Sequence, residues 1–155
     1  MQLQVIAVGE RMPSWVREGY AEYARRLPRE CALVLREIAP ARRGRNYDIE
    51  RAVAEEGQRI LAAVAEGTHV VALHVSGKPW STADLAQALE RWSRRGAKLA
   101  FLIGGPDGLS RACLERADET WSLSRLTFPH ALVRILLAEQ IYRAWSLLHR
   151  HPYHR

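Results

Sequence analysis

The sequence predicts an α/β fold in a single domain over residues 1–155, with a mostly parallel sheet flanked by helices. Apolar, β-branched segments alternate with segments of helical periodicity, which is typical of a parallel sheet covered by helices. Two segments, VVALHV (70–75) and LAFLI (99–103), are almost continuously apolar, as strands buried on both faces are. No repeat, low-complexity tract or linker divides the 155 residues, a length that suits one domain.

Two strands and one helix are expected first. LQVIAVG predicts a strand over 3–9 that ends at a glycine, and ALVLREI predicts a second strand over 32–38. The helix between them covers 13–27, and Pro13 is tolerated in its first turn. Its expected inward face consists of Trp15, Val16, Tyr20, Tyr23, Ala24 and Leu27.

The middle of the chain continues this alternation. Asp48 suits the cap of a helix over about 49–66. The residues expected to face the core from this helix are Ile49, Val53, Ile60, Leu61 and Val64. HVVALHV predicts a third strand over 69–75, and Ser81 then caps a helix that stops at Gly96.

The last third contains the most apolar segment. KLAFLIG predicts a strand over 98–104, and SRACLERA a short helix over 110–117. WSLSRLTF, at 121–128, is interpreted as a short strand followed by an irregular loop. A long helix over 130–150 is apolar on almost every side, so it must be buried all round. Two interpretations stay open: a central helix of the monomer, or a helix partly covered by a second copy of the chain.

Charge favours a polyanionic partner. The net charge is +6, and residues 123–155 hold five arginines against one acid, Glu139. A second basic cluster, ARRGRNY, lies at 41–47. Because arginine suits bidentate contact with phosphate, nucleic-acid binding is favoured over a merely solvated basic surface. Glu139 and Arg143 are also spaced for an ion pair along one helix.

Metal, membrane and secretion signals are not found. Cys31 and Cys113 are isolated, and the three histidines near the C-terminus match no standard metal motif. No apolar run reaches the roughly 18 residues of a membrane span, and residues 1–9 lack the features of a signal peptide. We therefore expect a cytoplasmic protein with reduced thiols, no metal and no membrane partner.

The stretch FLIGGPDGLS (101–110) leads a strand into a glycine-rich turn, at the sheet edge where such folds bind ligands. It matches neither the GxxxxGK[ST] phosphate loop nor the GxGxxG dinucleotide fingerprint. Two interpretations remain. The glycines either supply the positive φ angles of a tight turn, or they let a ligand approach the backbone closely.

Four segments carry a family resemblance: LQVIAVGERMPSWVREGYAEYARRLP at the start, then LIGGPDGLS, then WSLSRLTFPHALVRILLAEQIYRAWS, then the terminal HPYHR. Over essentially its full length the sequence resembles the trefoil-knotted SPOUT methyltransferases. The similarity is greatest to the RlmH group, the large-subunit rRNA pseudouridine N3-methyltransferases. The resemblance implies a trefoil knot in the C-terminal half, a homodimer, and S-adenosylmethionine (SAM) held in the knot.

The resemblance also implies which residues contact the cofactor: Leu73, Gly104, Gly105, Leu123, Ser124, Arg125, Leu126, Thr127 and Phe128. The apolar side chains among them suit a flat adenine ring. The glycines would admit SAM where a Cβ would clash. On that interpretation, Gly105→Val abolishes cofactor binding and leaves the dimer folded.

The candidate catalytic residues are His130, Arg143, Tyr153 and His154. The N3 proton of a pseudouridine must leave during transfer, which calls for a base or a cation that stabilises the anion. The HPYHR tail suits stacking and phosphate contact with an unpaired RNA base, and a floppy terminus is the plain alternative.

The expected reaction is therefore SAM-dependent methylation at N3 of a pseudouridine in 23S rRNA, within the large subunit or the whole ribosome. Two alternatives remain. One is a SPOUT methyltransferase acting on tRNA. The other is a non-catalytic, basic RNA-binding dimer.

Overall fold

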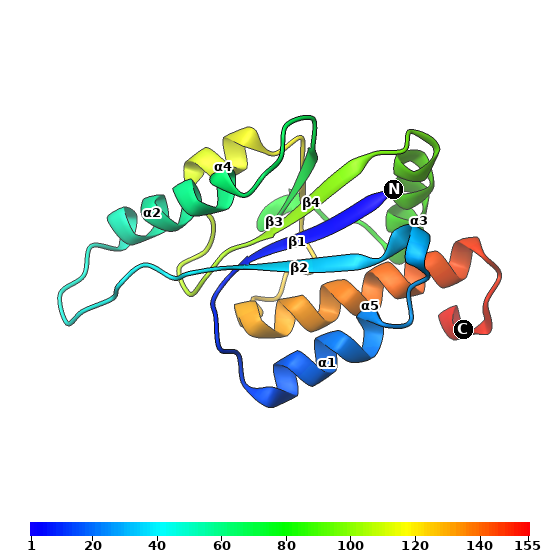
Figure 1. The fold of residues 1–155 in the computed structure, drawn as a ribbon, viewed down its shortest axis with the longest axis horizontal. Helices are drawn as coiled ribbons and strands as arrows, with labels where there is room; N and C mark the ends of the chain where they lie inside the picture. The colour runs from blue at the N-terminus through cyan, green and yellow to red at the C-terminus, as the bar shows by residue number, and fades with distance from the viewer.

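The computed structural model describes residues 1–155 and contains one five-stranded sheet (Figure 1). Its strands follow the order β2-β1-β4-β3-β5, and every neighbouring pair is parallel. The strands are β1 (Gln2–Val8), β2 (Leu33–Ile38), β3 (His69–Lys78), β4 (Lys98–Ile103) and β5 (Glu119–Trp121). The predicted parallel α/β sheet is thus confirmed.

Helices cover both faces of the sheet. They are α1 (Ser14–Ala24), α2 (Ile49–Ala62), α3 (Thr82–Arg94), α4 (Arg111–Arg116) and α5 (His130–Leu148). α2 and α4 lie together on one face, whereas α1 and α5 lie side by side on the other, where α3 also packs against α5 (Figure 1). Each face has its own cluster of buried apolar residues, centred on Phe101 and Leu137 on the α5 side and on Leu102 and Ile60 on the α2 side.

The helix starts agree with the sequence prediction where a polar cap was expected. Asp48 accepts a hydrogen bond from the backbone N–H of Arg51, and Ser110 accepts one from that of Cys113. Ser81 forms a reciprocal capping box with Asp84. Pro13, expected inside the first turn of α1, is instead the residue immediately before the helix.

Two expected helix faces were partly wrong. Trp15 is 56% exposed, and Ile49 is 54% exposed. α1 meets α5 through Val16, Gly19 and Tyr20, and Trp15 lies off this face. A Cβ on Gly19 would lie 2.8 Å from the Cδ1 atom of Ile135, so the glycine is what lets the two helices approach.

The segment 121–128 also differs from expectation. The short strand expected to start at Trp121 is β5, which instead starts at Glu119 and ends at Trp121. The N–H of Ser122 still donates to the carbonyl of Lys78 on β3, at 2.9 Å, but the side chains of the serines that follow Trp121 bond locally. The hydroxyl of Ser122 donates to the carbonyl of Ser124, and the hydroxyl of Ser124 accepts from the N–H of Leu126. Such local bonds compete with a strand ladder, so residues 122–129 form a loop.

The long helix α5 is not buried all round within one chain. Seven of its residues are buried, including Leu137 and Ile141. Leu147 is exposed, and several apolar residues are only half-buried: Leu132, Val133, Ile135, Leu136, Trp145 and Leu148. Of the two interpretations left open, the one in which the monomer alone buries α5 on every side is therefore wrong. None of the helices has the length and apolarity needed to cross a membrane.

Candidate functional site

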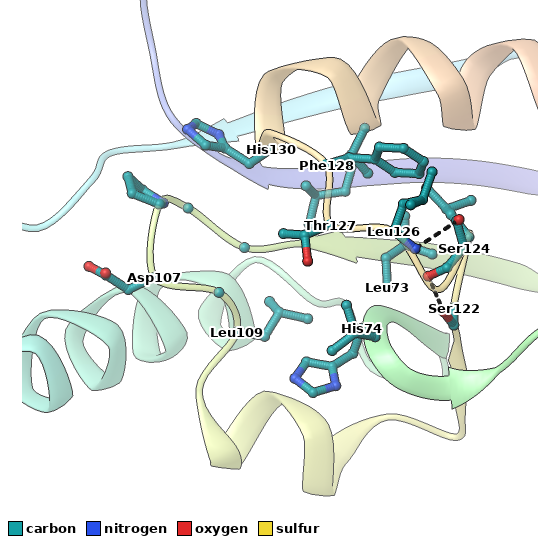
Figure 2. Close-up of a pocket in the computed structure, with 18 residues that line it drawn as sticks. Leu73, His74, Asp107, Leu109, Ser122, Ser124, Leu126, Thr127, Phe128 and His130 are labelled. Carbon is teal, nitrogen blue, oxygen red and sulfur yellow. Dashed lines mark hydrogen bonds between the residues drawn. The ribbon is translucent and has the colours of Figure 1, made fainter.

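A cavity of about 350 Å³ opens at the carboxyl ends of β3 and β4 (Figure 2). Because these strands are parallel neighbours, the residues that follow them meet at one edge of the sheet. Three segments line the cavity: 73–75 on β3, 103–109 after β4, and the loop 122–128 with the start of α5. The glycine-rich turn after β4 was expected at this edge, because the carboxyl ends of parallel strands are where such sheets bind ligands.

Eight of the nine predicted cofactor residues line this cavity: Leu73, Gly104, Gly105, Leu123, Ser124, Leu126, Thr127 and Phe128. Arg125 does not line it and is exposed. Ile103, Leu109 and Val133 also line the cavity and were missed by sequence reasoning. His74, Val75 and Asp107 line it too, and they lie at strand ends, where a parallel sheet is expected to bind ligands. Two signals point to these last residues. For His74 and Val75, the signal is that β3 continues beyond Val75. For Asp107, it is the polar position in the GGPDG turn.

The glycines of the GGPDG turn are required by the chain's own packing. A Cβ on Gly104 would lie 2.4 Å from the carbonyl carbon of Gly108, and one on Gly105 would lie 2.9 Å from a methyl group of Val8. Gly108 has a φ of +83°, and its N–H donates to the carbonyl of Gly105. The chain's own packing is therefore sufficient to require glycine at both positions, and close approach of a ligand to Gly104 and Gly105 stays a prediction. A Gly105→Val change would disturb the folded turn itself.

A buried ion-pair cluster holds this turn in place. The Glu56 carboxylate, 2% exposed, accepts two hydrogen bonds from the Arg43 guanidinium, at 2.6 and 3.1 Å, and one from the N–H of Ala41. Arg43 also donates to Asp107 in the GGPDG turn, at 3.0 Å. The hydrogen bonds to Glu56 and Asp107 raise the pKa of Arg43 further, so its charge is permanent. In the sequence, Arg43 looks like any other basic residue of 41–47, because its acidic partners Glu56 and Asp107 are distant in the chain.

The loop 122–128 presents unpaired backbone donors beside apolar side chains. The N–H groups of Leu123, Thr127 and Phe128 have no acceptor within the chain. Leu126 is 69% exposed although it lines the cavity. Figure 2 shows Leu126, Thr127 and Phe128 on one side of the cavity and Leu73 close by. The loop can therefore offer both apolar contact and hydrogen-bond donors to a bound molecule.

His130 is the one catalytic candidate that lines the cavity. Its Nδ1 atom is buried and has no hydrogen-bond partner. Burial lowers the pKa of His130, and the nearby positive charge of Arg134 lowers it further, so the imidazole is neutral at pH 7. Arg134 is itself almost fully buried, where it donates to Glu37 at 2.7 Å and to the carbonyls of Val8 and Gly9. A neutral, unpartnered imidazole at a cavity wall can accept or donate a proton.

Arg143, Tyr153 and His154 lie at the opposite end of α5 from this cavity. Thirteen residues of helix separate His130 from Arg143, which is about 20 Å along the axis. The structure therefore does not bring the four catalytic candidates together within one chain.

The C-terminal tail is packed onto α5 as a short 3₁₀ helix over Pro152–His154. The Tyr153 ring lies 4.6 Å from that of Tyr142, and its hydroxyl donates to Glu139 at 3.1 Å. Arg143 forms the expected pair with Glu139 at 2.8 Å and lies over the Tyr153 ring. Burial and the charge of Glu139 raise the pKa of Tyr153 to about 12. The phenol thus stays protonated and acts as a hydrogen-bond donor, which makes it unsuited to be a base.

No group of three or more histidine, cysteine, aspartate or glutamate side chains is placed to hold a metal ion. Both cysteines are buried and unpaired.

Comparison with known proteins identifies the same family over the whole chain. Residues 1–154 match the family model described as "Predicted SPOUT methyltransferase". Curated relatives named "Ribosomal RNA large subunit methyltransferase H" are similar along the full sequence. The relative from Methylococcus capsulatus is 67% identical over 100% of both chains. That from Thioalkalivibrio sulfidiphilus is 57% identical over 100% of this chain and 99% of its own.

Solved structures with little sequence identity share the fold. TrmJ from Z. mobilis is 18% identical and has a TM-score of 0.54, covering 93% of this chain and 70% of its own. A probable methyltransferase from Bordetella pertussis is 15% identical and has a TM-score of 0.53, covering 92% of this chain and 95% of its own.

Proposed function

This chain belongs to the SPOUT methyltransferase family, and from this premise we propose that it is a SAM-dependent methyltransferase of large-subunit rRNA. Its relatives' names specify the large ribosomal subunit. In finer detail, we propose that the methyl acceptor is N3 of a pseudouridine in 23S rRNA, presented by the large subunit or the assembled ribosome. The protein then acts in the cytoplasm, and we expect a trefoil knot in its C-terminal half.

One observation carries the proposal: a cavity at the carboxyl ends of β3 and β4 suits a nucleoside-like cofactor. Its volume of about 350 Å³ falls within the range of roughly 300–1,000 Å³ that is usual for small-molecule sites. Leu73, Leu123 and Leu126 can contact the faces of an adenine ring. The unpaired N–H groups of Leu123, Thr127 and Phe128 can bind its edge or the carboxylate of the amino-acid part. The residues present therefore fit SAM.

SAM supplies an activated methyl group to the nucleophile. The chain's own contribution is to position the two reactants and to handle the proton that leaves N3. His130 is our candidate for that proton, because burial holds its imidazole neutral beside the cavity. Arg143 is our candidate for stabilising the negative charge that develops on the base, because it remains cationic. Tyr153 and His154 are candidates for holding the RNA base.

These roles require a homodimer. Arg143 lies about 20 Å from His130 along one helix, too far to act on the same atom. The half-buried apolar residues of α5 offer a surface that a second copy would cover. We propose that the C-terminal end of α5 and the tail of one copy complete the cavity of the other.

Methyl transfer from labelled SAM tests the proposal. The substrates are ribosomes that lack their natural methylation, compared with naked rRNA and tRNA. Label on a pseudouridine of the large subunit or the whole ribosome is the expected result. Label on tRNA alone would support SAM as the methyl donor but would contradict rRNA as the substrate. Absence of both transfer and SAM binding would favour a non-catalytic RNA-binding dimer.

A further inference from the structure

The loop between β2 and α2 contains three arginines in two different environments. Arg43 is largely buried and is bonded to Glu56 and Asp107. Arg42 and Arg45 are exposed, and their side chains form no ion pair or hydrogen bond within the chain. Of the three arginines, only Arg43 anchors the loop, so Arg42 and Arg45 are free to contact a binding partner.

A groove of about 710 Å³ lies beside this loop, and three arginines line it: Arg42, Arg51 and Arg59. Its two acids are already engaged. Asp48 caps α2 by accepting the N–H of Arg51, and Glu55 pairs with Arg59 at 3.5 Å. The side chains of Arg42 and Arg51 have no carboxylate within ion-pair distance. The groove therefore presents uncompensated positive charge.

The groove is linked to the cofactor cavity by a hydrogen bond between Tyr47, which lines the groove, and Asp107, which lines the cavity. Arg43 and the Tyr47 hydroxyl both reach the Asp107 carboxylate, at 3.0 and 3.4 Å. Asp107 lines the cavity, and Figure 2 shows its side chain pointing away from the cavity centre. A polyanion that delivers a base to the cavity would thus extend naturally across Tyr47 and the free arginines.

We propose that this groove binds the phosphate backbone of the substrate RNA next to the target nucleotide. Arg42 and Arg51 are the phosphate contacts in the groove, and Arg45 is a further contact on the adjoining loop. The inference rests on the proposed function for the identity of the RNA. Exposed guanidinium groups without acidic partners suit phosphate, which they bind through paired N–H donors. Tyr47, 37% exposed at the groove, can stack on a base of the same strand.

The inference is tested by measuring affinity for undermethylated ribosomal particles across a range of salt concentrations. The double variant Arg42→Gln/Arg45→Gln is compared with the unmodified protein. Each lost contact to single-stranded phosphate should reduce the slope of log affinity against log salt by about 0.7. Affinity near physiological salt should fall by roughly tenfold. SAM affinity, measured by calorimetry without RNA, should be unchanged, because neither residue lines the cavity.

A charge-matched control is Arg94→Gln/Arg111→Gln. Both arginines are exposed, and each pairs with an acid on its own helix. We expect the control to keep the salt slope of the unmodified protein. An unchanged slope in Arg42→Gln/Arg45→Gln, or an equal loss in both double variants, would overturn the inference. Particle binding needs no turnover, so a failure of methyl transfer by the unmodified protein would instead count against the proposed function.

Discussion

At the scale of single residues, the ion pair between Arg43 and the buried Glu56 carboxylate is expected to contribute strongly to the stability of the fold. Arg43→Ala leaves the Glu56 carboxylate buried and without its cation. Removing one partner of a buried pair costs about 3 kcal/mol or more. Urea unfolding of Arg43→Ala should show this loss, whereas Arg42→Ala, from an exposed and unpaired position, should stay within about 0.5 kcal/mol of the unmodified protein. Equal stability of the two variants would show that the cluster does not hold the turn.

A substitution at Gly105 tests whether packing or ligand access requires a glycine at this position. A Cβ there would press on Val8, so Gly105→Ala should lower the free energy of unfolding by about 1–3 kcal/mol in the absence of any ligand. Gly44→Ala is the matched control, because a Cβ at Gly44 meets nothing within 4 Å. Normal stability of Gly105→Ala combined with lost SAM affinity would show that ligand access, and not packing, requires the glycine.

His130 should make stability depend on pH in a known direction. Its pKa in the folded protein is lowered below 6.5 by burial and by Arg134, so near that pH the unfolded chain binds more protons. Its contribution to stability is therefore complete above pH 6.5 and is lost as the pH falls toward the folded pKa. The fall in unfolding free energy from about pH 7.5 to about pH 5.5 should be smaller in His130→Gln. An identical fall in both proteins would mean that His130 titrates normally.

At the scale of elements, capping residues were sufficient to predict where helices begin, but periodicity was not sufficient to predict which helix faces are buried. The caps at Asp48, Ser81 and Ser110 involve partners three residues away, so the sequence displays them directly. Glu56 was not expected inside α2, because the guanidinium that permits its burial comes from a separate loop. Trp15 is exposed because α1 turns a different face, with Gly19 against Ile135, toward α5, and periodicity alone does not specify which face that is.

The same distinction explains the candidate site. The expectation of a parallel sheet was enough to place Leu73, Gly104 and the loop after Trp121 at the carboxyl edge, since parallel strands end together, but the order of the strands came only from the structure. The separation of His130 from Arg143 also follows from helix geometry, but only once both are known to lie on one unbroken helix. The tail is different. Its docking on Tyr142 and Glu139 depends on a reversal of the chain near Arg150, which has a φ of +54°.

The tail provides a prediction at this scale. A chain ending at His151 loses the contacts of Tyr153 with Tyr142, Glu139 and Arg143. SAM affinity should remain within about twofold, because the proposed SAM contacts all come from residues 73–128, whereas the tail is proposed to hold the RNA base. Methyl transfer to ribosomal particles should be lost. Calorimetry and single-turnover assays would separate these effects, and retained transfer would remove the tail from the mechanism.

At the scale of the whole molecule, the distribution of functional groups along α5 decides how many chains make one site. The cavity and His130 are at one end of the helix, and Arg143 and the tail are at the other. A chain acting alone would have to unpack its tail to bring them together. A dimer needs no such change, and it would also cover the apolar residues of α5 that one chain leaves half-exposed.

Heterodimers of two inactive variants test this arrangement directly. His130→Ala impairs the cavity side of a site, and removal of residues 152–155 impairs the tail side. In a shared-site dimer that carries one copy of each, both defects fall in the same site and the second site is intact. Co-expressed heterodimers, isolated through two different tags, should therefore show about half the transfer activity of the unmodified dimer. Each variant alone should be inactive. If every site were built within one chain, the heterodimer would have a defect in each site and would stay inactive, and the dimer proposal would have to be abandoned.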